Sequence, residues 1–171
     1  CGVTKRAQVF PIGIDPDSFA QQAEACEHDF DVQRLQISLR GRPLIIGVDR
    51  LDYSKGIPER FHGYEAFLKR FPEHKGKVMY LQITPVSRGT VEEYRLLKQE
   101  LDETAGRING MYGDFDWTPI RYITRPISRQ ILAGFYRLAD AALVTPLRDG
   151  MNLVAKEYVA AQDEEDPGVL I

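Results

Sequence analysis

The segment from Thr145 to Glu157 has the residue pattern of an anion-binding site. Apolar residues 141–144 before it predict a short buried strand, and residues 152–161 predict a helix that follows a turn. The start of a helix leaves backbone N–H groups unpaired at the positive end of the helix dipole, so it can hold a diphosphate without a charged side chain. The sequence therefore predicts a phosphate cradle from Gly150 to Val154.

Two carboxylates lie close to this cradle. Asp149 directly precedes it, where an acidic group suits sugar hydroxyls better than a phosphate. Glu157, about one to two turns into the helix, is placed to accept hydrogen bonds from a ribose. The same residues also fit an ordinary strand–turn–helix junction in which Asp149 or Asn152 caps the helix. The residues alone leave both interpretations open.

A pair of cations follows another apolar run, residues 44–48, which predicts a strand buried on both faces. Arg50 and Lys55 lie on the loop after this strand, and ligands of open α/β sheets gather outside the carboxyl ends of the strands. Arginine grips phosphate oxygens with a bidentate fork and lysine adds a point charge, so the pair suits a diphosphate. The alternative is a pair of surface cations neutralised by Asp49 or Asp52.

Two more loops are expected at the same edge of the sheet. Arg88 follows the predicted strand at 78–83, and Pro126 and Ile127 follow the predicted strand at 120–124. Four loops would then converge on one site.

Strands and helices alternate along the chain, which predicts an α/β fold with a Rossmann-like parallel sheet and crossover helices. A helical segment at 18–40 should break near residues 28–31. Other predicted features are a helix opened near Pro58 with an apolar face, a charged helix from Thr90 to about Ala105, a loop at 107–119 anchored by Trp117, a helix capped by Ser128, and a fifth strand from Val169. The apolar face comprises Phe61, Tyr64, Leu68 and Phe71.

Size and composition exclude several classes of protein. The chain has 171 residues, which fits one domain, and a formal net charge of −3, which gives no basic footprint for nucleic acid. No apolar run is long enough to span a membrane and no leader is evident, so we expect a cytoplasmic protein. Two cysteines cannot form a disulfide framework. Because both ends look cut, we expect a piece of a longer protein.

The motifs that are missing narrow the chemistry. No G-x-G-x-x-G follows a strand, so the predicted phosphate cradle suits a nucleotide-sugar better than a dinucleotide. No P-loop motif is present, which argues against a P-loop kinase or ATPase. The three histidines fall on helical segments or helix ends, which leaves a hydrolase triad without a placed base. Asp15-Pro16-Asp17 could hold a divalent cation, but helix capping by Asp15 explains it better.

Four motifs together resemble the trehalose-phosphate synthase family, retaining glycosyltransferases of family 20 with two Rossmann domains (GT-B). They are residues 47–56, 87–89, 106–110 and 145–157, and the resemblance covers the whole chain. It implies transfer of glucose from UDP-glucose to glucose 6-phosphate, giving trehalose 6-phosphate and UDP without a metal or other cofactor. The leaving phosphate would help to deprotonate the acceptor, with no enzyme nucleophile.

Site residues follow from this resemblance by position. Arg50 and Lys55 resemble the donor diphosphate ligands, and Arg88 resembles the residue that reaches the acceptor phosphate. Ile127 falls where the family contacts the uracil ring, largely through backbone. The glucose-facing turn would comprise Asp149, Gly150, Met151 and Asn152, and the donor-binding helix start Leu153, Val154, Ala155, Lys156 and Glu157. Arg50, Lys55 and Asp149 are thus the candidate catalytic residues.

The resemblance also implies a partner domain. Residues 1–20 would form the inter-domain connection and first helix cap, and residues 21–171 an incomplete nucleotide-sugar-binding domain. The amino-terminal acceptor domain would lie outside this chain, so the isolated fragment should be nearly inactive. A homo-oligomer is possible. Two other functions stay open: a non-catalytic sugar-phosphate sensor, and another GT-B glycosyltransferase with a different donor or acceptor.

Overall fold

Strands and helices alternate along the chain, as the sequence predicts. The computed structural model describes residue 6 and residues 8–86 and 92–171. Its elements are α1 (Pro16–Ala25), α2 (Phe30–Leu39), β1 (Leu44–Val48), η1 (Tyr53–Lys55), α3 (Ile57–Arg70), η2 (Pro72–His74), β2 (Met79–Ile83), α4 (Glu92–Tyr112), β3 (Ile120–Ile123), α5 (Arg129–Leu138), β4 (Ala141–Ala142), α6 (Leu153–Ala161) and β5 (Val169–Leu170).

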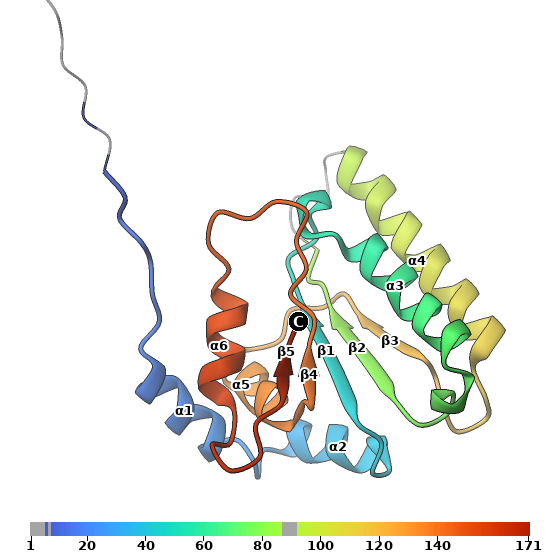
Figure 1. Ribbon diagram of the computed structural model, residues 1–171, viewed down its shortest axis with the longest axis horizontal. Coiled ribbons are helices and arrows are strands. Elements are labelled where there is room, and N and C mark those ends of the chain that lie inside the picture. The colour runs from blue at the N-terminus through green and yellow to red at the C-terminus, as the bar shows by residue number, and fades with distance from the viewer. Residues whose placement is uncertain (1–5, 7, 87–91) are drawn as a thin grey trace, which may run out of the picture.

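The five strands form one parallel sheet in the order β3-β2-β1-β4-β5. The helices α3 and α4 cover one face, whereas α1, α5 and α6 pack together on the other (Figure 1). The chain winds outward in one direction from β1 and in the other from β4, so the topological switch point lies between these two strands. Ligands of doubly wound sheets bind at such a point. The predicted Rossmann-like sheet is confirmed.

Local capping signals place the helix starts correctly. Asp15 accepts a hydrogen bond from the Ser18 amide at 3.2 Å and caps α1, which agrees with the capping interpretation of Asp15-Pro16-Asp17. Asp29 caps α2 after the predicted break, and Ser128 caps α5. Each side chain satisfies an amide that has no partner inside its helix.

One prediction about a helix end is wrong. The helix α4 continues through Gly106 to Tyr112, so the predicted loop begins only at Gly113. The cost of a helical glycine, about 1 kcal/mol, is outweighed by the buried contacts of Leu101 and Ile108 on the same helix. Trp117 anchors the shortened loop as predicted, with its indole N–H donating to the Val78 carbonyl at 2.8 Å.

The predicted apolar face of α3 is confirmed at three of its four positions. Phe61, Tyr64 and Leu68 are buried, but Phe71 is 40% exposed because the helix ends one residue before it. Its ring packs on Phe67 and His74 at the surface instead. The predicted cap Thr90 lies outside the described residues. Within the described ranges, no helix is both long and apolar enough to cross a membrane.

Candidate functional site

The loops that follow β1 and β4 meet at the switch point of the sheet. The Ser54 carbonyl accepts hydrogen bonds from the amides of Leu147 and Arg148, at 2.9 and 3.1 Å. Gly56 has a φ of +64°, and a Cβ atom there would lie 2.7 Å from the Thr145 carbonyl oxygen. Only glycine therefore allows this close approach of the two loops.

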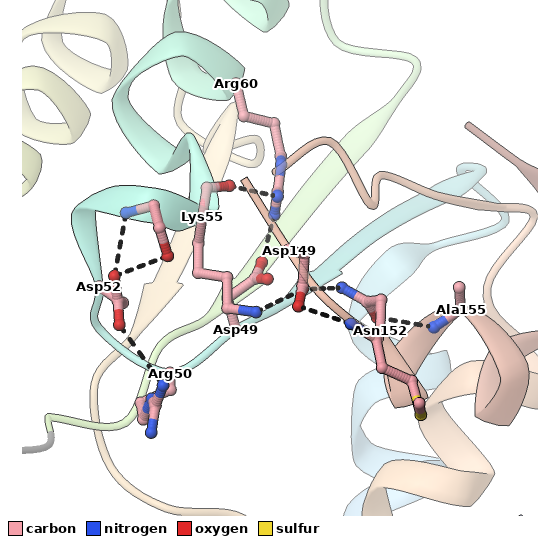
Figure 2. Close-up of polar contacts among 10 residues, drawn as sticks. Asp49, Arg50, Asp52, Lys55, Arg60, Asp149, Asn152 and Ala155 are labelled. Atoms are coloured by element: carbon pink, nitrogen blue, oxygen red, sulfur yellow. Dashed lines mark hydrogen bonds and ion pairs between the residues drawn. The ribbon is translucent and has the colours of Figure 1, made fainter. Parts of the chain in front are cut away.

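Lys55 and Asp149 join the two loops through their side chains. The Lys55 ammonium lies 2.6 Å from Asp149 Oδ2 (Figure 2), and the side chains are 18% and 17% exposed. The hydrogen bond from Lys55 lowers the pKa of Asp149 below its ordinary value. The sequence offered Asp49 or Asp52 as the neutralising partner of Lys55, and the structure shows Asp149 in that role.

The start of α6 has features of both an ordinary capped helix and an anion-binding site, the two interpretations that the sequence left open. Asn152 is the cap, because its side-chain oxygen accepts the Ala155 amide at 3.0 Å. Asp149 does not cap the helix, but accepts the Met151 amide at 3.3 Å and the Asn152 side-chain amide at 3.0 Å. Within the described part of the chain, no acceptor contacts the amides of Leu153 and Val154. The cap thus leaves amides for an anion.

Arg50 is a cation with a weak partner. Its side chain is 55% exposed and lies 3.4 Å from Asp52 Oδ2. Asp52 is engaged more tightly by the amide and hydroxyl of Ser54, at 2.9 and 2.8 Å. These hydrogen bonds outweigh the opposing effect of burial and lower the pKa of Asp52. An exposed ion pair of this length contributes little free energy, so Arg50 is available to a ligand on the same loop as Lys55.

The first residue of α5, Arg129, contacts α6. The Arg129 guanidinium lies 3.2 Å from Glu157 Oε1. Glu157, the residue predicted to bind the ribose, therefore lies beside the start of α5. Ile127, two residues before Arg129, packs its half-buried side chain against the hydrophobic core. The side chain thus belongs partly to the packing of the domain.

The remaining predicted site residues have different surroundings. Lys156 donates to the Ile12 carbonyl at 3.1 Å, and the Met151 sulfur accepts the Ile12 amide at 3.0 Å. Both side chains therefore contact the segment before α1, rather than the space beside Lys55. A Cβ atom at Gly150 would meet no atom within 4 Å, so the turn is open there. Arg88 lies outside the described residues.

Sequence reasoning missed the buried Arg60, which lies beneath both loops. Its guanidinium forms an ion pair of 2.6 Å with Asp49. The spacing of eleven residues across a strand-to-helix loop gives no recognisable motif. As for metals, the described residues contain no group of three or more histidine, cysteine, aspartate or glutamate side chains that could hold an ion.

Residues 2–171 match the glycosyltransferase family 20. The chain belongs to this family. It is 51% identical over 171 residues to trehalose-6-phosphate synthase of Escherichia coli O1:K1 / APEC, which covers 100% of this chain and 36% of that protein. The family 20 chain therefore spans about a third of the length of the relatives it matches.

Solved structures agree with this assignment. The structure of the E. coli protein bound with UDP-2-fluoro glucose matches with a TM-score of 0.91 and 52% identity. The match covers 96% of the present chain and 36% of the E. coli chain. The α,α-trehalose-phosphate synthase (UDP-forming) of Burkholderia xenovorans in complex with glucose-6-phosphate has a TM-score of 0.93 and 48% identity, covering 94% and 35%. These matches confirm the predicted fold class, a Rossmann-like half of a GT-B glycosyltransferase.

Proposed function

We propose that this chain is the donor-binding part of a retaining glucosyltransferase. The enzyme moves glucose from UDP-glucose to glucose 6-phosphate and releases trehalose 6-phosphate and UDP. One observation carries the proposal. In a family 20 chain, Asp149 contacts both the Lys55 ammonium and Asn152, the cap of α6, and no acceptor among the described residues contacts the next two amides of that helix. Such a group of donors suits the diphosphate of a nucleotide-sugar.

The role of these groups is to stabilise the leaving group. As the bond between glucose and phosphate breaks, negative charge builds on the diphosphate, and preorganised cations and amides lower the free energy of that state. Lys55 lies on the loop after β1, and the amides of Leu153 and Val154 begin the helix that follows the β4 loop; the two loops are already in contact. Arg50 adds a second cation from the exposed side. Asp149, once separated from Lys55, accepts hydrogen bonds from the glucose hydroxyls.

Other ligands are assigned by position in the family. Glu157 holds the ribose, residue 127 contacts uracil through its backbone, and Arg88 reaches the acceptor phosphate. No metal takes part, because the cations and amides already neutralise the diphosphate.

We also propose that the segment before α1 connects this domain to an amino-terminal acceptor domain. Since α1 packs on α5 and α6, that connection ends at Asp15 rather than at residue 20.

A coupled assay of UDP release by the natural full-length protein carrying this chain tests the proposal. Arg50→Ala and Lys55→Ala should each lower kcat/KM by about 10- to 1000-fold, because each removes a cation from the developing charge. Arg95→Ala is the matched control, since Arg95 lies exposed on α4 and forms an ion pair with Glu92 on the same helix. Near-normal turnover in the first two variants would contradict their assignment.

The same preparation separates the rival functions. A sugar-phosphate sensor would bind its ligands without releasing UDP. A glycosyltransferase of different donor preference would turn over ADP-glucose or GDP-glucose faster than UDP-glucose. Addition of a chelator tests whether the reaction needs a metal ion. We expect the rate of turnover to be the same with and without magnesium.

A further inference from the structure

Arg60 is a buried arginine whose side chain contacts four residues on three segments of the chain. Its side chain is 2% exposed, and its Nη1 lies 2.6 Å from Asp49 Oδ2 at the end of β1. Nη1 also donates to Gln82 Oε1 on β2 at 3.1 Å. Nε donates to Thr145 Oγ1 after β4 at 3.1 Å. Nη2 donates to the Lys55 carbonyl at 3.2 Å, and Figure 2 shows this contact together with the Asp49 ion pair.

This set of contacts requires a guanidinium. Arginine presents five N–H donors in a rigid planar fork, whereas lysine offers a single point charge on a flexible stem. The sheet also leaves room for the group: a Cβ atom on Gly47 would lie 2.9 Å from Arg60 Nη1 and 2.3 Å from Gln82 Oε1. The site beneath the loops is therefore shaped around the Arg60 fork.

Two of the four contacts lead directly to the proposed diphosphate ligands. The Lys55 carbonyl belongs to the residue whose ammonium pairs with Asp149. Thr145 lies four positions before Asp149 on the other loop. One rigid group thus contacts both loops. The Ser54 carbonyl joins the same two loops through its hydrogen bonds with the amides of Leu147 and Arg148.

The Arg60–Asp49 pair contributes geometry rather than charge. Both side chains are almost fully buried and neutralise each other, so the net charge offered to a ligand is close to zero. A buried ion pair is weak evidence for stability, because well-packed apolar residues of similar volume often serve the fold as well or better. Stability alone therefore does not account for a charged fork at this position.

We propose that Arg60, with its counter-ion Asp49, is a positioning residue that sets the distance between the β1 and β4 loops and so places Lys55 against the donor diphosphate. The inference rests on the function proposed above and adds a residue that does not touch the donor. Its consequence is that UDP binding depends on the shape of the Arg60 side chain as well as on protein stability.

The test compares four forms of the natural full-length protein by calorimetric titration with UDP, at a temperature where thermal denaturation shows all of them folded. They are wild type, Arg60→Lys, the double variant Arg60→Met with Asp49→Leu, and Leu101→Ala. Leu101 is fully buried on α4 and serves as the destabilised control. We expect the UDP Kd to rise about tenfold or more in both Arg60 variants and to stay within twofold in Leu101→Ala. Wild-type affinity in either Arg60 variant, or an equal loss in Leu101→Ala, would overturn the proposal.

Hydrogen–deuterium exchange gives a readout that does not depend on UDP. Peptides covering residues 50–56 and 145–152 should both exchange faster in the double variant, and neither should in Leu101→Ala. Unchanged exchange in these two loops would also overturn the positioning role. If wild type fails to bind UDP while the loops still loosen together, the proposed function fails and the positioning of the loops by Arg60 stands.

Discussion

Lys55 and Asp149 are 94 positions apart in the sequence, and their side chains form an ion pair of 2.6 Å. The pair spans the switch point of the sheet, where the loops after β1 and β4 meet. A diphosphate that enters this place competes with the Asp149 carboxylate for the Lys55 ammonium. Under the proposed function, we therefore expect binding of the nucleotide to be linked to release of Asp149 toward the sugar, and this link has consequences that can be measured.

Asp149→Asn should separate nucleotide binding from turnover. Removing the carboxylate frees Lys55 and takes a negative charge away from the diphosphate, so UDP should bind about fivefold more tightly. Turnover of UDP-glucose should fall by about 10- to 100-fold, because hydrogen bonds from the sugar to a charged acceptor are lost. Calorimetry and the coupled assay measure the two effects. Asp102→Asn is the control, since Asp102 pairs with Lys98 on α4. Weaker UDP binding by Asp149→Asn would count against the competition.

Gly56→Ala should disturb the contact between the loops. The φ of +64° is unfavourable for alanine, and the added Cβ atom would lie 2.7 Å from the Thr145 carbonyl oxygen. Gly76→Ala is a matched control, because Gly76 has a φ of +76° and no atom within 4 Å of its Cβ position. We expect chemical denaturation to show Gly56→Ala about 1–3 kcal/mol less stable than Gly76→Ala. UDP affinity should fall in Gly56→Ala alone, and equal behaviour of the two variants would show that the loop contact is unimportant.

Glu65→Gln should weaken the dependence of stability on acidic pH. Hydrogen bonds from Arg107, at 2.8 and 2.7 Å, lower the pKa of Glu65 from 4.5 to about 2. Because the pKa of the folded state lies below that of the unfolded state, the stabilisation is present above pH 4.5 and is lost as the pH falls toward 2.

The expected size is on the order of 1–2 kcal/mol near neutral pH, discounted because Arg107 is partly exposed. Denaturation curves at several pH values measure it. The free energy of unfolding should fall more steeply for wild type than for Glu65→Gln between pH 4.5 and pH 2. Parallel curves would show that the Arg107 contact does not stabilise the fold.

Local sequence signals predicted the elements of the fold well. Asp15 and Ser128 lie just before their helices, and a cap depends only on residues three positions ahead or fewer. The continuous apolar run at 44–48 predicted a strand buried on both faces, and residues 78–83 predicted the next strand. The end of α4 was missed because Gly106 is locally unfavourable, while the contacts that carry the helix to Tyr112 are long-range.

The candidate site was predicted only in part. Loop position indicated Arg50, Lys55 and Asp149, but the contact between Lys55 and Asp149 depends on which strands are neighbours in the sheet. Arg60 could not be predicted as part of the site, because its partners Asp49, Gln82 and Thr145 are brought together only by the fold. Placement of Met151 and Lys156 against Ile12 likewise needed the path of the segment before α1.

Calorimetric titration of UDP into wild type and Lys55→Ala is the most direct test that this rim of the sheet binds a nucleoside diphosphate. Lys98→Ala provides the control, because Lys98 forms an ion pair of the same 2.6 Å length with Asp102 away from the loops. We expect the UDP Kd to rise at least about tenfold in Lys55→Ala, as for the loss of one charged hydrogen bond, and to stay unchanged in Lys98→Ala. Equal UDP affinity in Lys55→Ala and wild type would contradict the account.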